Sequence, residues 1–427
     1  MSLSLGIDLG TSGVRSAVIN AAGELISEAR RSYGAAAAFR EPEAWWSAVR
    51  GCLSDQMQSL RETGRSSTDI AAIAVDGTSG SLVLVDRALS AVTPALMYSD
   101  GGLSGEAEQI AAQAPHLHIT RGSNSSLARL LHLQSLPGAK EAAGVLHQAD
   151  FVLARLRREG GVSDENNALK LGFDPETKAW PAWYSRLPLK TELLPRIVPA
   201  GTQLGPIDQD VASEFGLSPS TWLHAGTTDS LAAFLAAAPL ETGSAVTSLG
   251  TTLAIKVVSE TRIDAPEMGL YSHRLGGRWL VGGASNTGGG ALLTQFSADE
   301  IRRLSARINA KEASPLDYYP LARAGERFPQ NDPTFAPRMG PRPESDVAHL
   351  HGLLEGIARI EASCYDLIQE LGGPRADVIL TTGGGAHNRA WTEIRSRVLG
   401  RSLGEGAAHE AAVGAARLTQ LPQHTGA

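Results

Sequence analysis

A short pattern occurs twice in this chain of 427 residues, once near its start and once just past its middle. Asp8-Leu9-Gly10-Thr11-Ser12 lies between two apolar, strand-like runs, and Ser248-Leu249-Gly250-Thr251-Thr252 lies between two more. Each copy has the pattern of a strand, a glycine turn and a second strand. A repeated supersecondary unit at this separation predicts two half-molecules of similar topology.

The elements around the two copies predict an α/β chain. In the first half, apolar runs predict strands over residues 5–9, 14–19, 24–30, 70–76 and 82–85, with a helix over 43–60. In the second half, helical spacing predicts a helix over 355–371, and a strand is expected over 378–382, before Gly383. We therefore expect a domain over residues 1–236 and another over 237–427, the last helix of which packs back on the first domain.

The first glycine turn suits a bound phosphate. Gly10 and Gly13 let backbone N–H groups converge, and Thr11 and Ser12 add hydroxyl donors. Asp8 would repel a phosphate directly, so its natural partner there is a hydrated Mg²⁺. An ordinary hairpin turn explains this segment equally well when it is taken alone. The second copy, with Gly250 and Thr251, favours a polyphosphate and hence a nucleotide.

A third glycine turn follows the predicted strand over 378–382. Gly384 and Gly385 allow a ligand to approach closely, and a helix starting there would present free N–H groups. Asn388 could hydrogen-bond a ribose or a base edge. The order of the glycines is not that of the Rossmann dinucleotide motif. A tight strand-to-helix turn without a ligand is the alternative.

Polar residues also follow two other predicted strands. Asp229 precedes an apolar helix, where it could be a capping residue or a general base for an alcohol that attacks a phosphoryl group. Asp76 and Ser79 lie at the end of a buried strand, where ligands gather in α/β sheets. Lys170 lies in a polar loop and could equally be solvated.

The amino-acid composition excludes some classes of binding partner. The formal net charge of −7 opposes a broad nucleic-acid surface, but it does not oppose a nucleotide held by backbone N–H groups. Two cysteines cannot build a disulfide framework, and no apolar run has the length of a membrane span. We expect a cytoplasmic monomer or homodimer with no membrane or nucleic-acid partner.

Taken in chain order, these motifs resemble the FGGY family of carbohydrate kinases over nearly the whole chain. Further matching segments are Gly226–Asp229, Asn286–Gly289, Gly325–Pro329, Leu354–Gly356 and Gly383–Trp391. The resemblance implies an actin-like, ribonuclease-H-like fold with two domains around an ATP cleft, which agrees with the duplication.

Within that family the chain resembles short xylulokinase-like proteins that phosphorylate D-ribulose. The residues that carry this likeness are 74–80 and 166–174. Typical xylulokinases carry Gly-Gln-Met-His-Gly in the first of these segments, with the His touching the sugar, and Asp76–Gly80 lacks that His. The expected reaction is phosphorylation of O5 of D-ribulose, with D-xylulose as the alternative.

The resemblance also implies roles for individual residues, with ATP and Mg²⁺ as cofactors. Asp229 would be the general base, Asp8 would hold Mg²⁺ through water, and Ser79 would contact the sugar together with these two acids. Thr11 would stabilise the transferring phosphoryl group with the turn Gly10–Gly13. Residues implied for the rest of ATP are Gly250 and Thr251 for the β- and γ-phosphates, and Gly384, Gly385, Asn388 and Trp391 for adenosine.

Two other classes remain open at the level of sequence. The same fold serves actin-like and chaperone-like ATPases, which use no sugar. A kinase-derived sugar sensor without catalysis is the other alternative, and the intact Asp229 opposes it.

Overall fold

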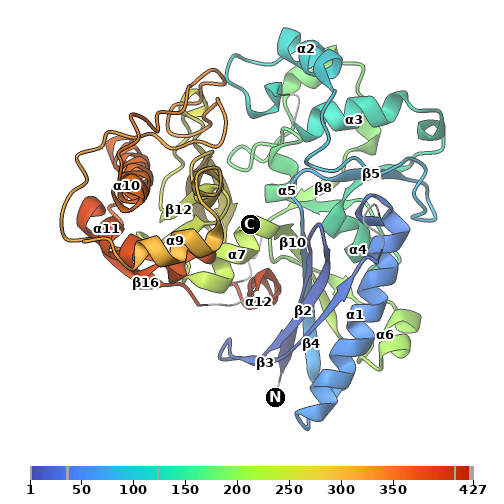
Figure 1. Cartoon of the computed structure of the whole chain (residues 1–427). Coiled ribbons are helices and arrows are strands. Elements are labelled where there is room, and N and C mark those ends of the chain that lie inside the picture. Colours follow the sequence, from blue (N-terminus) through green and yellow to red (C-terminus); the bar gives the residue numbers. More distant parts are fainter. Residues whose placement is uncertain (1, 35–37, 123–124, 408–409, 423–427) are drawn as a thin grey trace. The chain divides into compact units, whose positions relative to one another are not determined.

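The computed structural model describes residues 2–34, 38–122, 125–407 and 410–422. The chain divides into two compact units. The first comprises residues 1–236, 274–277 and 409–427, and the second comprises 237–273 and 278–408. Each unit contains one six-stranded sheet with helices packed on it (Figure 1).

The sheet of the first unit has the strand order β3-β2-β1-β4-β10-β9. Its strands are β1 (Leu3–Leu9), β2 (Gly13–Ile19), β3 (Leu25–Ser32), β4 (Ile70–Gly77), β9 (Gln203–Pro206) and β10 (Trp222–Thr228). The three central strands β1, β4 and β10 are parallel, and the outer strands are antiparallel to their neighbours. Their carboxyl ends therefore meet at one edge of the sheet.

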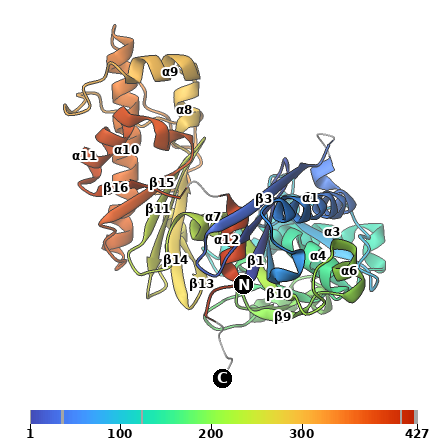
Figure 2. The ribbon, with the colours of Figure 1, turned by 90° about the horizontal axis from the view of Figure 1, so that it is seen from below.

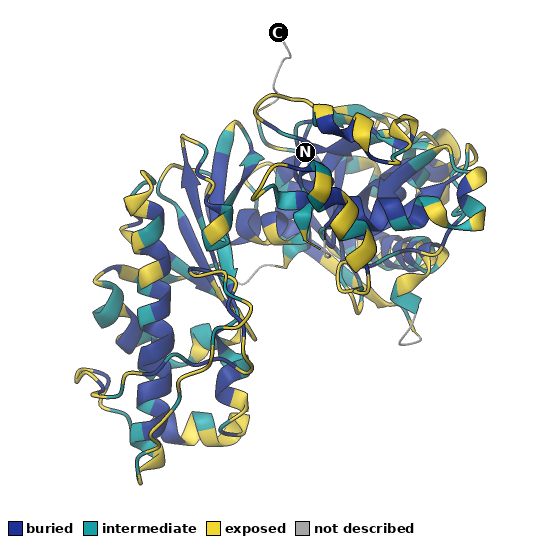
Figure 3. Cartoon of the chain, turned by 90° about the horizontal axis from the view of Figure 1, so that it is seen from above, coloured by how far each residue is buried: buried dark blue, intermediate teal, exposed yellow. Residues whose placement is uncertain are grey.

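Helices cover both faces of this sheet. Apolar side chains of α1 (Pro42–Glu62) and α4 (Gln148–Arg157) pack with alternate residues of β1, such as Leu5 and Ile7, in one core. The helices α7 (Asp229–Ala237) and α12 (Ala411–Leu418) cover the other face, and α6 (Gln209–Phe215) lies near α1. Figure 3 shows the strands as largely buried and the outer faces of the helices as exposed.

The backbone of helix α12 is in contact with the backbones of β1 and α7. A Cβ built on Gly6 of β1 would lie 1.9 Å from the carbonyl oxygen of Ala412, and one on Gly414 would lie 1.7 Å from that of Ala232 in α7. Only glycine fits at either place. In Figure 2, α12 lies beside β1 and α7.

A smaller part of the first unit lies outside the main sheet. The predicted strand over 82–85 forms as β5 (Leu82–Val85), but it pairs with β6 (Gly144–His147) rather than joining the six-stranded sheet. The helices α2 (Ser104–Gln113) and α3 (Ser126–Ser135) share a separate apolar core with it. A further pair of strands, β7 (Val162–Asp164) and β8 (Arg196–Val198), precedes and follows the short helix α5 (Glu165–Leu169).

The sheet of the second unit has the order β13-β14-β12-β11-β15-β16. Its strands are β11 (Ala245–Leu249), β12 (Leu253–Ser259), β13 (Tyr271–Leu275), β14 (Arg278–Ser285), β15 (Val378–Thr382) and β16 (Ser402–Glu405). Its helices are α8 (Gly289–Leu293), α9 (Ala298–Ser305), α10 (Asp346–Glu370) and α11 (Arg389–Leu399). Helix α10 begins nine residues before the predicted position, because the Ser345 side chain caps it by accepting from Ala348 N.

The duplication predicted from the two glycine turns is confirmed by the topology. The strands β3-β2-β1-β4-β10 of the first unit and β14-β12-β11-β15-β16 of the second follow the same order of pairing. In both series, the first two pairs of neighbouring strands are antiparallel and the last two pairs are parallel. The two copies of the repeated turn join β1 to β2 and β11 to β12.

The segment between α9 and α10 contains no α-helix or strand. In the part of the chain that the structure describes, no helix is both long enough and apolar enough to cross a membrane.

Candidate active site

Three carboxyl groups come together at the carboxyl edge of the first sheet. Asp8 is the penultimate residue of β1 and is in register with Asp76 on β4, and Asp76 is in register with Thr227 on β10. Asp229 follows two residues after Thr227, as the first residue of α7. This edge is where α/β sheets bind their ligands.

Burial controls the charge of these acids. Asp76 is fully buried, and desolvation raises its pKa well above the ordinary value, with the charges of Asp8 and Asp229 adding to the effect. Asp8 is 5% exposed, and burial raises its pKa too, although its hydrogen bond with Asp76 and the nearby Arg15 oppose that change. We therefore treat Asp76 as the neutral member of the pair and as a hydrogen-bond donor to Asp8.

Arg15 is a site residue that the sequence reasoning missed. It lies directly opposite Asp8 on β2, and its Nη1 is 3.4 Å from Asp8 Oδ2. The same nitrogen lies 3.6 Å from Glu410 Oε2, ahead of α12. Counting residues symmetrically about the Gly10–Gly13 turn would have placed Arg15 across from Asp8.

The turn from Gly10 to Gly13 has the geometry expected of a ligand loop. Gly10 N donates to Gly13 O at 3.0 Å, and Tyr33 Oη donates to Gly10 O at 3.0 Å. A Cβ on Gly13 would lie 2.3 Å from a β3 carbonyl oxygen, so glycine is required there. Thr11 and Ser12 are exposed at the tip, which leaves their hydroxyls accessible to a ligand.

The turn that carries Ser79 is held rigidly. Thr78 Oγ1 lies 2.6 Å from Ser81 Oγ and donates to Gln148 Oε1 at 2.7 Å, and Thr78 N donates to the same oxygen. Gly80 has a φ of +93°, which favours glycine. Ser79 itself is half-buried, just beyond Asp76.

The carboxyl group of Asp229 lies at the start of α7 and makes a local contact there. One carboxyl oxygen accepts from Ser230 N at 2.6 Å, which is a local contact typical of the first turn of a helix. The residue remains half-buried, whereas Asp76 and Asp8 are buried. It is therefore the most accessible of the three acids to a substrate.

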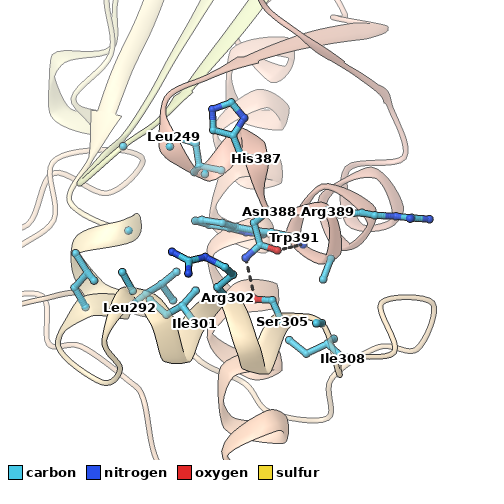
Figure 4. A pocket seen from close by; sticks show the side chains of 18 of the residues that line it. Leu249, Leu292, Ile301, Arg302, Ser305, Ile308, His387, Asn388, Arg389 and Trp391 are labelled. Atoms are coloured by element: carbon cyan, nitrogen blue, oxygen red, sulfur yellow. Dashed lines mark hydrogen bonds between the residues drawn. The ribbon is translucent and has the colours of Figure 1, made fainter.

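The second unit contains a cavity of about 950 Å³ (Figure 4). All six residues predicted there from the two glycine turns line it, namely Gly250, Thr251, Gly384, Gly385, Asn388 and Trp391. Apolar side chains complete the wall, including Leu249, Leu292, Ile301 and Ile308. A cavity of this volume, with an apolar wall and glycine turns at one side, suits a nucleotide.

The third glycine turn differs from its prediction in one respect. Residues Gly384–His387 form a 3₁₀ turn, and α11 begins only at Arg389, because the Asn388 side chain accepts from Trp391 N at 3.2 Å and caps it. Asn388 Nδ2 donates to Ser305 Oγ of α9 at 2.9 Å, as Figure 4 shows. Ser305 is a second residue that sequence reasoning missed.

The hairpin with Gly250 and Thr251 is held by a neighbouring glycine turn. Gly289 N donates to Gly250 O at 2.8 Å, and Gly290 N donates to Thr251 O at 2.9 Å. This turn follows β14, whose end is fixed by the buried Glu326. The carboxyl group of Glu326 accepts from Ser285 Oγ, Asn286 N, Tyr319 Oη and Arg327 N at 2.7–2.9 Å.

The carboxyl groups at the edge of the first sheet could hold Mg²⁺ only if water and phosphate oxygens supplied most of its ligands. Across the described ranges, no three His, Cys, Asp or Glu side chains are grouped so that they could hold a metal ion. Mg²⁺ is commonly bound by one or two carboxylates, several waters and substrate phosphates. The carboxylate of Asp8 therefore fits a hydrated ion that a nucleotide brings with it.

Comparison with known proteins links both units to one family. The model of the FGGY family of carbohydrate kinases, N-terminal domain, matches residues 3–132, and the corresponding C-terminal domain model matches residues 245–420. The xylulose kinase of Escherichia coli (strain K12) is 26% identical, over 98% of this chain and 89% of that protein.

Solved structures support the same fold. A xylulose kinase from Rhodospirillum rubrum superposes with a TM-score of 0.85 at 21% identity, over 99% of this chain and 91% of the other. A xylulose kinase structure from Brucella ovis gives 0.84 at 22%, over 98% and 90%. The predicted actin-like, ribonuclease-H-like α/β fold is thereby confirmed.

Proposed function

The chain belongs to the FGGY family of carbohydrate kinases, and we propose that it transfers the γ-phosphate of ATP to O5 of a ketopentose. The observation that carries this proposal is the half-buried Asp229 at the carboxyl edge of the first sheet, beside the buried pair Asp8 and Asp76. An acid in that position can take the proton of an attacking hydroxyl group.

In the proposed mechanism, Asp229 hydrogen-bonds the sugar hydroxyl and accepts its proton as the oxygen attacks the γ-phosphorus. The contact with Ser230 N fixes one carboxyl oxygen, so that the carboxylate is oriented before the sugar binds. Ser79 hydrogen-bonds another part of the sugar from its rigid turn. Positioning of this kind is the main contribution of a protein to phosphoryl transfer.

Asp8 has the second role at the same edge. It would hydrogen-bond the sugar and would hold Mg²⁺ through water, while Arg15 and Asp76 keep its carboxyl group in place. A bound Mg²⁺ neutralises charge on the phosphate oxygens. Thr11 and the turn from Gly10 to Gly13 stabilise the transferring phosphoryl group.

The second unit would hold the rest of ATP. Gly250 and Thr251 bind the β- and γ-phosphates, and the cavity of about 950 Å³ receives adenosine against Gly384, Gly385 and Trp391. Asn388 donates one amide hydrogen to Ser305 and has a second one for the nucleoside. We accordingly propose domains over 1–236 on the sugar side and 237–427 on the ATP side.

D-xylulose is the first sugar to test, because the curated relatives are xylulose kinases. D-ribulose is the second candidate, and a specific observation favours it. The Asp76–Gly80 turn presents Ser79 where typical xylulokinases present a histidine to the sugar. We place the enzyme in the cytoplasm, where ATP is available, as a monomer or homodimer without a nucleic-acid partner.

The test is coupled ADP production with a panel of ketoses and polyols, compared by kcat/KM. ADP release that depends on a pentulose, with a 5-phosphate as product, supports the proposal. ADP release that no sugar increases would instead support an actin-like or chaperone-like ATPase. Binding of a sugar without any product would support a sugar sensor.

A further inference from the structure

Lys170 lies near the proposed sugar site, directly after helix α5. Lys170 follows α5 and is half-buried, and its Nζ makes no hydrogen bond or ion pair with any residue that the structure describes. By contrast, Lys190, which is exposed, still donates to the carbonyl oxygen of Ala139. This nitrogen keeps accessible surface, so it can exchange bound water for an oxygen of a ligand.

The backbone and the stem of Lys170 are both fixed. Its carbonyl oxygen accepts from Ser126 N at 3.1 Å. Its Cδ lies 4.0 Å from the position that a Cβ on Gly80 would take, so the stem packs on the turn that presents Ser79. The ammonium group, one methylene further along, is therefore confined to the neighbourhood of that turn.

Helix α5, which ends one residue before Lys170, also contacts the strand that leads to Asp229. Asn166 Nδ2 donates to Thr227 Oγ1 at 3.2 Å, two residues before Asp229. The segment from 166 to 170 thus touches the end of β10 at one side and the turn after β4 at the other. These are the two places from which Asp229 and Ser79 are presented.

The neighbouring cation cannot take the same role. Arg129 lies close to Gly80, but its Nε donates to Met97 O at 2.9 Å and its Nη2 donates to Tyr98 O at 2.6 Å. Those bonds fix the guanidinium group to the backbone before Asp100. Of the two described cations beside Gly80, Lys170 is therefore the one with donors left for a ligand.

We propose that Lys170 binds the sugar by donating hydrogen bonds to an oxygen other than O5, and that it sets sugar affinity and preference. This inference rests on the proposed function, because O5 is assigned there to Asp229. A ketopentose offers neutral hydroxyl and carbonyl oxygens along the rest of its chain. Hydrogen bonds from a charged donor to such acceptors are worth about 1.5–3 kcal/mol.

The first experiment compares Lys170→Met with the wild type. We expect KM for the preferred ketopentose to rise about 10- to 150-fold, which corresponds to the loss of about 1.5–3 kcal/mol. KM for ATP should change less than about twofold, since the residues proposed for adenosine and for the β- and γ-phosphates lie in the other unit. Lys140→Met is the matched control, since Lys140 is exposed outside the site, and it should behave as wild type.

The second experiment uses deoxyketoses, each lacking one oxygen of the substrate. With the wild type, removal of the oxygen that Lys170 contacts should raise KM, whereas in Lys170→Met the same removal should have no further effect. Lys170→Gln, which keeps a donor, should recover part of the affinity and also serves if the Met variant does not fold.

The outcomes separate the two proposals. If the wild type phosphorylates a ketopentose and Lys170→Met has the same KM for it, this inference is wrong and the proposed function stands. If the removal of each oxygen raises KM by the same factor in the wild type and in Lys170→Met, a direct contact between Lys170 and the sugar is also excluded. If the wild type phosphorylates no sugar of the panel, both proposals fall together.

Discussion

The carboxyl group of Asp76 lies against that of Asp8, in register on the neighbouring parallel strand and without exposed surface of its own. Two negative charges at this depth would repel each other strongly, so one of the two groups holds a proton. Desolvation acts most on Asp76, which keeps Asp8 as the anion that meets Arg15 and the substrate. Three predictions concern this edge of the sheet, and two concern stability.

Asp76→Asn should retain folding and activity within about tenfold, because an amide reproduces a neutral acid that donates to Asp8. Asp76→Leu should lose more activity, since it removes the donor and keeps the bulk. Thermal unfolding and kcat of the two variants would be compared. Equal, large losses in both would show that Asp76 acts as a charged group.

Asp229→Ala should lower kcat by roughly two to four orders of magnitude while ATP still binds, because the proton acceptor is removed. The measurements are steady-state turnover and nucleotide binding by calorimetry. Asp210→Ala, on exposed α6, is the control. Near-normal turnover of Asp229→Ala would reject its role as general base.

Asp8→Ala should lower the rate and shift the Mg²⁺ titration to higher concentration, because Asp8 is assigned both the sugar and the hydrated ion. The rate would be measured as a function of Mg²⁺ at fixed, saturating ATP. A variant that is slow but has an unchanged Mg²⁺ midpoint would mean that Asp8 has no part in holding the ion.

Glu165→Gln should stabilise the protein at alkaline pH. Burial, with a contribution from Asp164, raises the pKa of Glu165 from 4.5 to about 8. Between these values the unfolded chain releases the proton and the folded chain keeps it, so this group's contribution to stability is full below pH 4.5 and is lost as pH rises to about 8. The melting temperatures of the wild type and of Glu165→Gln should agree at about pH 5 and differ at about pH 9. If the difference in melting temperature between the two proteins did not change with pH, Glu165 would not have the raised pKa.

Arg395→Met should destabilise the second unit by about 3–5 kcal/mol, because it leaves Glu361 charged and unpaired in the core. Arg395 Nε and Nη2 contact the two oxygens of Glu361 at 2.6 and 2.7 Å, and Thr247 Oγ1 donates to Glu361 at 2.7 Å. Urea unfolding would measure the loss. The double variant with Glu361→Leu should recover much of it, and a double variant as unstable as the single one would refute this reading.

Local signals in the sequence were sufficient for much of the fold. The repeated glycine turns, flanked by apolar runs, predicted β1, β2, β11 and β12, and therefore the duplicated sheets. The second copy and the glycine turn after β15 also predicted six of the residues that line the cavity. The pairing of β5 was not predicted, since its partner β6 lies about sixty residues away in the chain.

The missed site residues reflect the same limit. Ser305 meets Asn388 across 83 residues, and Glu326 meets Ser285 across 41, so no local pattern reveals either contact. Lys170 has a polar, helix-ending context like that of many solvated lysines. Only its half-burial and its stem packed beside Gly80 distinguish it.

Helix α12 has a consequence for how the chain is made. It covers one face of the first sheet, where Gly6 and Gly414 permit backbone contact, yet it is translated after the whole second unit. While the ribosome is still synthesising residues 237–408, the face with Ala17 and Ile19 lacks its partner. The first half of the chain can therefore begin to fold as it emerges, but its packing is completed only after the second half has been translated.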